Sequence, residues 1–121
     1  MIKSVMKNTI KRNNDFKRIY QRGKSFADSL LVTYILRNRS NDISYGITAS
    51  KKIGNAVKRN RARRVIKESF REISNEFDMK LISGVQIVFV ARYRTTLANK
   101  NDIKKIMQTH LIRVGLITKM N

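Results

Sequence analysis

The segment from residue 51 to residue 72, KKIGNAVKRNRARRVIKESFRE, limits what this chain can fold into more than any other feature. It holds nine Lys or Arg and only two Glu. From about Asn55 to Asn75 its apolar residues recur with the period of a helix. They form one stripe: Ala62, Ile66, Phe70, Ile73 and Phe77. This helix must bury one face and expose dense positive charge on another, and that charge repels itself unless a polyanion covers it. The pattern therefore predicts a nucleic-acid-binding helix.

The composition agrees with a basic, single-domain protein. The chain has 121 residues, 41% of them hydrophobic, which suits one compact domain with a modest core. Its 27 basic and 8 acidic residues give a net charge of +19, so we expect a partner made of phosphates. The absence of Cys excludes disulfides and Cys-ligated metals, and no Trp is present to anchor a membrane-binding helix. No apolar run has the length of a membrane span or of a signal peptide. We expect a cytoplasmic protein with no membrane partner.

The remaining elements follow from periodicity and capping residues. Residues 1–12 are expected to form a flexible basic arm, and residues 13–121 a single RNA-binding domain. Asn14 is expected to cap a first helix, with Asp15 in its first turn, and Gly23 to stop it. Strands are expected at residues 25–27, 30–36 and 43–49, with the polar segment 37–42 (RNRSND) closing a hairpin. The apolar run after Gly84, VQIVFVA, indicates a strand buried on both faces.

A last helix completes the fold. Asn101 or Asp102 is expected to cap it and Gly115 to end it. Its apolar stripe is Ile103, Ile106, Met107, His110 and Val114. The order αβββαβα predicts an α/β fold, a single-domain α/β sandwich with one mixed sheet.

A second, polar stripe runs along the basic helix. It consists of Asn60, Arg63, Arg64, Lys67 and Arg71. Arginine forks bind phosphate with two hydrogen bonds, and the Asn60 amide could reach a sugar or a base. Because binding to phosphates releases counterions, the affinity should fall steeply with salt.

The segment Ser50–Arg71, SKKIGNAVKRNRARRVIKESFR, resembles the signature of the bacterial ribonuclease P protein component. Arg59, Asn60 and Arg61 stand at the position of its RNR motif. The resemblance extends upstream to Asp15-Phe16 and Arg22-Gly23, and it covers the chain from about Lys11 to Met107. Three positions depart from the family pattern. Tyr20 stands where Phe is common, Lys58 occupies a position that is often apolar, and residues 92–96 lack a frequent proline.

The resemblance implies a fold and a function. The family fold contains a left-handed βαβ crossover that includes the basic helix. The family protein is the small subunit of a ribonucleoprotein endonuclease that removes the 5′ leader from precursor tRNA. The implied cofactors are ribonuclease P RNA and Mg²⁺ held mainly by that RNA. The implied partners are the RNA and the precursor tRNA 5′ leader, bound by a monomer in a 1:1 complex with the RNA.

The resemblance also assigns residues by position. Contacts with the RNA are implied at Lys52, Asn55, Arg59, Asn60, Arg61, Arg63, Arg64 and Lys67. The charge pattern adds Lys51, Lys58 and Arg71. A leader cleft between the first helix and the sheet would be lined by Phe16, Tyr20 and Tyr34. The sequence alone leaves two roles open for these aromatic residues, core packing and stacking on unpaired nucleotides.

A protein-borne catalytic site is not predicted. Of the eight acidic residues, only Glu68, Glu72 and Glu76 fall in line, as a solvated row that Arg64, Arg71 and Lys80 would offset. His110 is the only His and falls on an apolar stripe, so we expect it to be packed. Ser50 lacks the His and Asp partners of a nucleophile. The alternative function is a non-catalytic structural protein that packs RNA or DNA, of ribosomal or nucleoid type. Such a protein would be indifferent to a 5′ leader.

Overall fold

The computed structural model describes residues 8–40, 42–77 and 84–118. These residues form three helices and four strands in the predicted order αβββαβα. The helices are α1 (Asn13–Arg22), α2 (Ala56–Glu76) and α3 (Lys100–Arg113). The strands are β1 (Lys24–Ala27), β2 (Leu31–Asn38), β3 (Ile43–Thr48) and β4 (Gly84–Ala91). Two short 3₁₀ helices are η2 (Lys51–Ile53) and η3 (Tyr93–Thr96).

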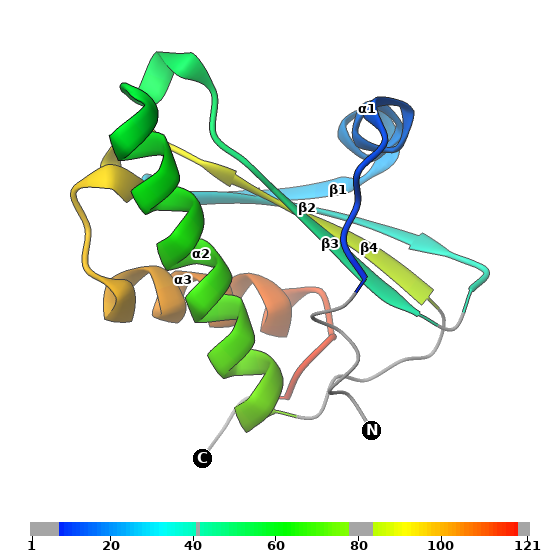
Figure 1. The fold of residues 1–121 in the computed structure, drawn as a ribbon. Helices are drawn as coiled ribbons and strands as arrows, with labels where there is room; N and C mark the ends of the chain where they lie inside the picture. Colours follow the sequence, from blue (N-terminus) through cyan, green and yellow to red (C-terminus); the bar gives the residue numbers. More distant parts are fainter. Residues whose placement is uncertain (1–7, 41, 78–83, 119–121) are drawn as a thin grey trace.

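The elements form three layers. Helix α1 lies on one face of the sheet, and α2 and α3 lie on the other (Figure 1). The predicted α/β sandwich is therefore confirmed. In the parts of the chain that the structure describes, no helix is both long and apolar enough to cross a membrane.

The sheet has the strand order β1-β2-β4-β3. Strand β2 pairs antiparallel with β1 and with β4, whereas β3 pairs parallel with β4. The predicted hairpin across residues 37–42 is therefore wrong, because β4 lies between β2 and β3. Polar turn residues indicate only that the chain reverses direction at the surface, and they do not determine whether the two strands that they join are neighbours in the sheet. The apolar β4 is almost entirely buried and lies inside the sheet, where β2 and β3 cover both of its edges.

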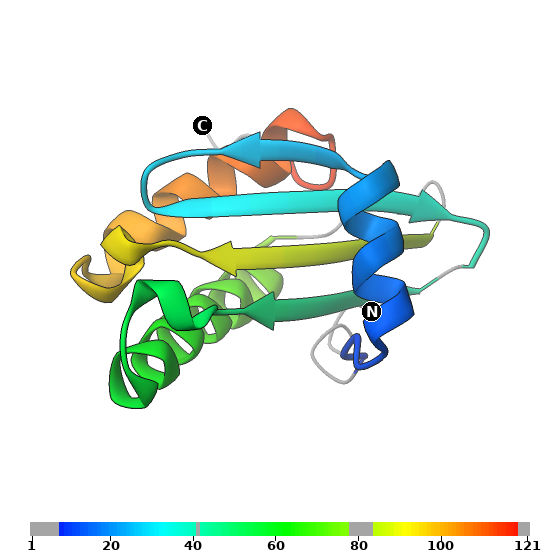
Figure 2. The same cartoon turned by 90° about the horizontal axis from the view of Figure 1, so that it is seen from above.

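The connection from β3 through α2 to β4 has an uncommon hand. Figure 2 views the sheet from the α1 side, with β3 and β4 both pointing left, β4 above β3 in the view, and α2 behind the sheet. This arrangement is a left-handed crossover, as the resemblance implied, whereas nearly all βαβ units are right-handed.

Two cores hold the layers together. The larger one lies between the sheet and helices α2 and α3, and it contains Phe70, Phe89 and Met107. The smaller one lies under α1 and contains Ile10, Ile19 and Val88. Since Val88 and Phe89 are adjacent in β4 and enter different cores, the prediction of a strand buried on both faces is confirmed.

Side-chain caps mark where α2 and α3 begin. Asn55 caps α2, its side-chain oxygen accepting a hydrogen bond from the Lys58 N–H at 3.0 Å. Helix α1 follows Arg12, which makes no side-chain cap hydrogen bond, so the prediction that Asn14 caps this helix is wrong, whereas Gly23 ends it as predicted. Asn99 caps α3, and its side-chain oxygen accepts a hydrogen bond from the Asp102 N–H at 2.9 Å. Asn101 and Asp102 lie in the first turn, so the prediction that one of them caps α3 is wrong.

His110 is fully buried, as predicted. Its Nε2 lies 2.6 Å from Asp28 Oδ2, and its Nδ1 lies 2.7 Å from Thr33 Oγ1. Both ring nitrogens therefore have partners, and the histidine links α3 to β2 and to the turn between β1 and β2.

The segment before α1 extends the sheet. Ile10 N–H donates to Tyr45 O at 2.7 Å, and Tyr45 N–H donates to Asn8 O at 2.9 Å. The Ile10 side chain is buried in the small core under α1. Residues 8–10 of the predicted flexible arm thus lie along the outer edge of β3, and residues 1–7 lie outside the described residues.

Candidate nucleic-acid interface

A tight turn leads the chain into the basic helix α2. Gly54 has a φ of +151°, which L-residues with a side chain rarely adopt. A Cβ atom there would lie 2.9 Å from Lys58 Cδ. The glycine therefore lets the chain pass close to the first turn of α2 before Asn55 caps it.

The predicted RNA-contact residues lie on the surface of η2 and α2. Arg59 and Arg63 are half-buried. The exposed ones are Lys51, Lys52, Asn55, Lys58, Asn60, Arg61, Arg64, Lys67 and Arg71. The predicted apolar stripe faces the core, with Ala62, Ile66, Phe70 and Ile73 fully buried and Phe77 half-buried. The two-sided pattern of α2 is confirmed, and whether each exposed residue contacts RNA stays a prediction.

The side chains of three of these arginines form hydrogen bonds or an ion pair within the protein. Arg61 Nη1 donates to Thr96 O in η3 at 3.0 Å. Arg63 donates to Asn60 Oδ1 at 3.1 Å and to Ala49 O at 3.3 Å. Arg71 forms an ion pair with Glu68. These bonds fix the directions of the three side chains.

The side chains of Arg64 and Lys67 remain unpaired. Within residues 8–40, 42–77 and 84–118, neither side chain forms a hydrogen bond or an ion pair with the protein. All their donors can therefore bind an external anion. A charge-assisted hydrogen bond to phosphate is roughly twice as strong as a neutral one.

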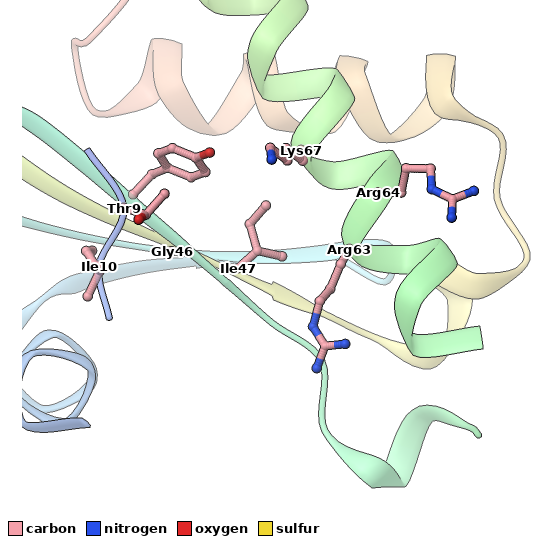
Figure 3. A pocket seen from close by; sticks show the side chains of 8 residues that line it. Thr9, Ile10, Gly46, Ile47, Arg63, Arg64 and Lys67 are labelled. Carbon is pink, nitrogen blue, oxygen red and sulfur yellow. The ribbon is translucent and has the colours of Figure 1, made fainter. Parts of the chain in front are cut away.

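A hollow of about 390 Å³ lies between α2 and the outer edge of the sheet. One wall is cationic, with Arg63, Arg64 and Lys67. The other is formed by residues 9–10 and 45–47. In Figure 3 the Lys67 side chain points from α2 toward Thr9, while the Arg64 guanidinium points away from Thr9. An apolar floor with cations at its rim suits a nucleotide, whose base is flat and whose phosphate is charged.

The three predicted aromatic residues lie side by side on the α1 side of the sheet. The ring centroids of Phe16 and Tyr20 are 6.3 Å apart, and those of Tyr20 and Tyr34 are 4.9 Å apart. The Phe16 ring lies so close to Gly46 that a Cβ there would be 2.8 Å from it. Tyr20 is 38% exposed and its hydroxyl lies 3.2 Å from Thr48 Oγ1.

Of the two roles left open for these rings, packing is visible in the structure, and stacking on nucleotides stays a prediction. Phe16 and Tyr34 are half-buried and pack against the small core under α1. Part of each ring therefore stabilises the fold. Tyr20 presents the most exposed of the three rings.

The carboxylates of α2 are held by cations, most of them on α3. Glu72 forms ion pairs with Lys100 and Lys104, the latter at 3.1 Å, and Glu76 pairs with Lys104 at 2.6 Å. The predicted offset of Glu68 by Arg71 is confirmed, but Arg64 has no such role, and Lys80 lies outside the described residues. Glu72 is also half-buried rather than fully solvated.

These pairs shift the ionisation of the groups involved. Hydrogen bonds from Lys100 and Lys104 lower the pKa of Glu72 below its ordinary value. The bond to Glu76 raises the pKa of Lys104. Among the residues that the structure describes, no group of three or more His, Cys, Asp or Glu side chains could hold a metal ion.

The structure exposes an aromatic residue, Tyr93, that was not among the predicted binding residues. Tyr93 in η3 is 55% exposed between Arg92 and Arg94, which are also exposed. The available signal was an aromatic residue between two arginines directly after a buried strand.

Comparisons with known proteins match nearly the whole chain. The family model described as Ribonuclease P matches residues 6–115. The ribonuclease P protein component of Clostridioides difficile is 42% identical over 107 residues, which cover 88% of this chain and 91% of the relative. That of Clostridium botulinum is 40% identical over 112 residues, covering 93% and 98%.

Solved structures show the same fold. The RNase P protein of Staphylococcus aureus is 30% identical, with a TM-score of 0.73 and coverage of 91% of this chain and 97% of that one. The RNase P protein of Thermotoga maritima, at 23% identity, also gives a TM-score of 0.73, with coverage of 88% and 96%.

Proposed function

This chain belongs to the ribonuclease P protein family, and from that premise we propose how its surface serves the enzyme. The protein is the accessory subunit of an endoribonuclease that acts in tRNA 5′ processing, and it associates with ribonuclease P RNA. We further assign bond cleavage and most of the Mg²⁺ to the RNA. The proposed complex contains one protein per RNA and acts in the cytoplasm, where precursor tRNA is made.

The unpaired cations of α2 support docking on the RNA. Arg64 and Lys67 are exposed, and their side chains form no hydrogen bond with the described part of the protein. In contrast, the Arg61 and Arg63 side chains donate hydrogen bonds to backbone carbonyls that hold them in place. A surface with some cations fixed and others free can follow the backbone of a folded RNA. This is the observation that carries the proposal.

The aromatic group supports a role in leader binding. Phe16, Tyr20 and Tyr34 are adjacent and belong to α1 and β2. Helix α1 covers the face of the sheet opposite α2 (Figure 1). Unpaired nucleotides stack on such rings without regard to sequence, which suits leaders of varied composition. The protein would thus hold RNA on one side and the leader on the other, and favour precursor over mature tRNA.

The assignment of catalysis to the RNA is supported by the surroundings of the acids and of the histidine. Glu72 is bound by two lysines, and Asp28 is bound by His110. Both nitrogens of the buried His110 ring have partners inside the protein. A metal-bound or general-base role would require breaking these contacts.

The test is cleavage of a precursor tRNA by a bacterial ribonuclease P RNA at low Mg²⁺, with and without this protein. Leader removal should occur only when both are present, because the protein's charge offsets repulsion between phosphates. A titration of RNA with protein should reach its plateau at equal concentrations. Tight binding to every RNA with no gain in correct cleavage would indicate a packing protein instead.

A further inference from the structure

The surface around η3 has the shape and chemistry of a nucleotide site. Two hollows adjoin there and share Tyr93 and Arg94. The first, of about 380 Å³, is completed by the apolar side chains Leu30, Leu97 and Ala98. The second, of about 270 Å³, is completed by Ser29 and Arg92. An apolar hollow beside a polar, cationic one matches a base and its phosphate.

The side chains at this site are exposed although they are large and apolar. Tyr93 is 55% exposed and Leu97 is 66% exposed. In the described part of the chain, the side chains of Tyr93 and Arg94 form no hydrogen bond or ion pair. An exposed aromatic ring beside unpaired arginine donors is typical of binding surfaces.

The backbone beneath these side chains is fixed. Thr95, fully buried, donates from its hydroxyl to Leu30 O at 2.6 Å and accepts from the Arg92 N–H at 2.8 Å. Thr96 donates from its hydroxyl to Tyr93 O at 2.6 Å. These bonds tie η3 to itself and to the segment before β2. The backbone that carries Tyr93 and Arg94 is therefore held in place, so binding would cost little backbone ordering entropy.

The charged residues that line the site are all positive. No acidic residue lines either hollow. The nearest carboxylate along the chain, Asp28, binds His110 through Oδ2, while Arg92 contacts only the Asp28 backbone oxygen, at 3.3 Å. The site would repel a second copy of this chain, whose net charge is +19, and it would attract a polyanion.

We propose that η3 binds one unpaired nucleotide of ribonuclease P RNA, with the base on Tyr93 in the apolar hollow and the phosphate on Arg94 and Arg92. The identity of the RNA rests on the function proposed above. The location supports it, because Arg61 of α2 donates to Thr96 O and joins η3 to the start of the basic helix. Figure 2 shows η3, in yellow-orange, at the same end of the sheet as the start of α2. The site extends the RNA surface beyond α2.

The first experiment measures the affinity of the full protein for ribonuclease P RNA after substitutions at Tyr93. Tyr93→Ala should weaken binding by about fivefold or more, the usual effect of losing one stacked base. Tyr93→Phe keeps the ring and should bind within about twofold of the wild type. Tyr93→Leu keeps apolar volume without a π-face and should bind as weakly as Tyr93→Ala. Circular dichroism would verify folding, which an exposed side chain should not affect.

A charge-matched pair tests the phosphate contact. Arg94→Ala should reduce the slope of log affinity against log salt by about 0.7 to 0.9, the value for one phosphate contact. Arg39→Ala removes the same charge from the turn at the opposite end of β2 and should leave the slope unchanged. Equal slopes for the two variants would overturn the phosphate assignment.

The absence of Trp offers an optical test, because Tyr93→Trp creates the only tryptophan in the chain. Binding of the RNA should quench its emission, whereas the emission of a Thr109→Trp control, at an exposed position on α3, should be unaffected. Poly-glutamate serves as an acidic protein probe. If it quenched Tyr93→Trp as strongly as RNA does, the surface would bind an acidic protein and the proposal would be overturned.

The outcomes separate this proposal from the function above. If the wild-type protein supports leader cleavage and Tyr93→Ala binds the RNA equally well, only the η3 site is wrong. The same holds if Tyr93→Phe loses as much affinity as Tyr93→Ala, because a stacking site requires the ring and not the hydroxyl. If the wild-type protein does not bind the RNA at all, both proposals are wrong.

Discussion

Two arginines on α2, Arg64 and Arg71, lie two helical turns apart and have different surroundings. Arg71 is paired with Glu68, and this pair raises the pKa of Arg71 and lowers that of Glu68. Arg64 has no hydrogen-bonded or ion-paired partner in the described part of the chain. An RNA phosphate can therefore bind Arg64 directly, whereas at Arg71 it must compete with a carboxylate.

This difference leads to a prediction for binding to ribonuclease P RNA. Arg64→Ala should weaken binding and lower the salt slope by about 0.7 to 0.9. Arg71→Ala removes an equal charge and should have the smaller effect on both quantities. Binding would be measured at four or more salt concentrations. If Arg71→Ala matched Arg64→Ala, the availability of donors would not be what selects the contacts.

Phe16 combines packing with an expected contact to the leader. Phe16→Ala should lower the ratio of affinities for precursor and mature tRNA by about fivefold, because one stacking ring is lost. Phe16→Leu is the matched control, since it retains apolar volume against Ile10 and Gly46 while it removes the π-face. It should lose the same discrimination and retain more stability. A preserved ratio with lower affinity for both RNAs would identify Phe16 as a packing residue only.

Individual side-chain partners could be predicted only where both lie on one element. The Glu68–Arg71 pair followed from spacing along α2, because residues three apart share a helix face. The partners of Glu72 are lysines of α3, far away in sequence, and no pattern within α2 points to them. The unpaired state of Arg64 depends on the same tertiary information.

At the scale of elements, the helices and strands followed from periodicity, and the pairing of strands did not. The apolar stripe of α2 and the continuous apolar run of β4 predicted a buried helix face and a strand buried on both faces. The polar turn after β2 suggested a hairpin, yet turn residues do not determine which strand lies alongside. Val88 of β4 pairs with Tyr34 of β2 on one side and with Gly46 of β3 on the other, so β4 lies between these two strands.

The candidate site shows the same division. The basic face of α2 was predictable because it lies on one helix, and the aromatic group followed from the family resemblance. The surface on η3 needs Leu30 and Leu97, which the fold brings together across more than half the chain. The sequence shows the aromatic residue between two arginines, but only the three-dimensional structure shows the apolar hollow beside it.

The stability that the contacts between α2 and α3 provide should depend on pH through the ionisation of Glu72. Lys100 and Lys104 lower its pKa in the folded state, so the unfolded state takes up a proton first as the pH falls. The stabilisation is therefore complete above the ordinary glutamate pKa and is lost as the pH falls through the lowered value. Glu72→Gln should reduce stability at neutral pH and flatten its decline in acid.

Denaturant unfolding at pH 7 and at several acidic pH values would measure this effect. Asp42→Asn is the control, because Asp42 is exposed and its side chain forms no ion pair in the described part of the chain. A Glu72→Gln curve parallel to that of the wild type across the acidic range would show that the contacts of Glu72 with α3 do not affect stability.

For the whole molecule, the net charge of +19 acts on folding and on binding in opposite directions. The ion pairs of α2 engage only a few of the 27 basic residues, so the free protein folds against its own repulsion. Bound RNA removes that repulsion. RNA binding should therefore raise the stability of the fold even in regions of the protein that do not contact the RNA.

Salt should separate the two effects. Raising NaCl from about 50 to about 200 mM screens repulsion and should raise the Tm of the free protein by a few degrees. The same change should weaken RNA binding by roughly a thousandfold if about six phosphates are contacted. Thermal melts and binding titrations in the same buffers would measure both, and melts with a saturating concentration of RNA should show a Tm that falls with salt. A free-protein Tm that also fell with salt would mean that specific ion pairs, rather than net repulsion, determine its stability.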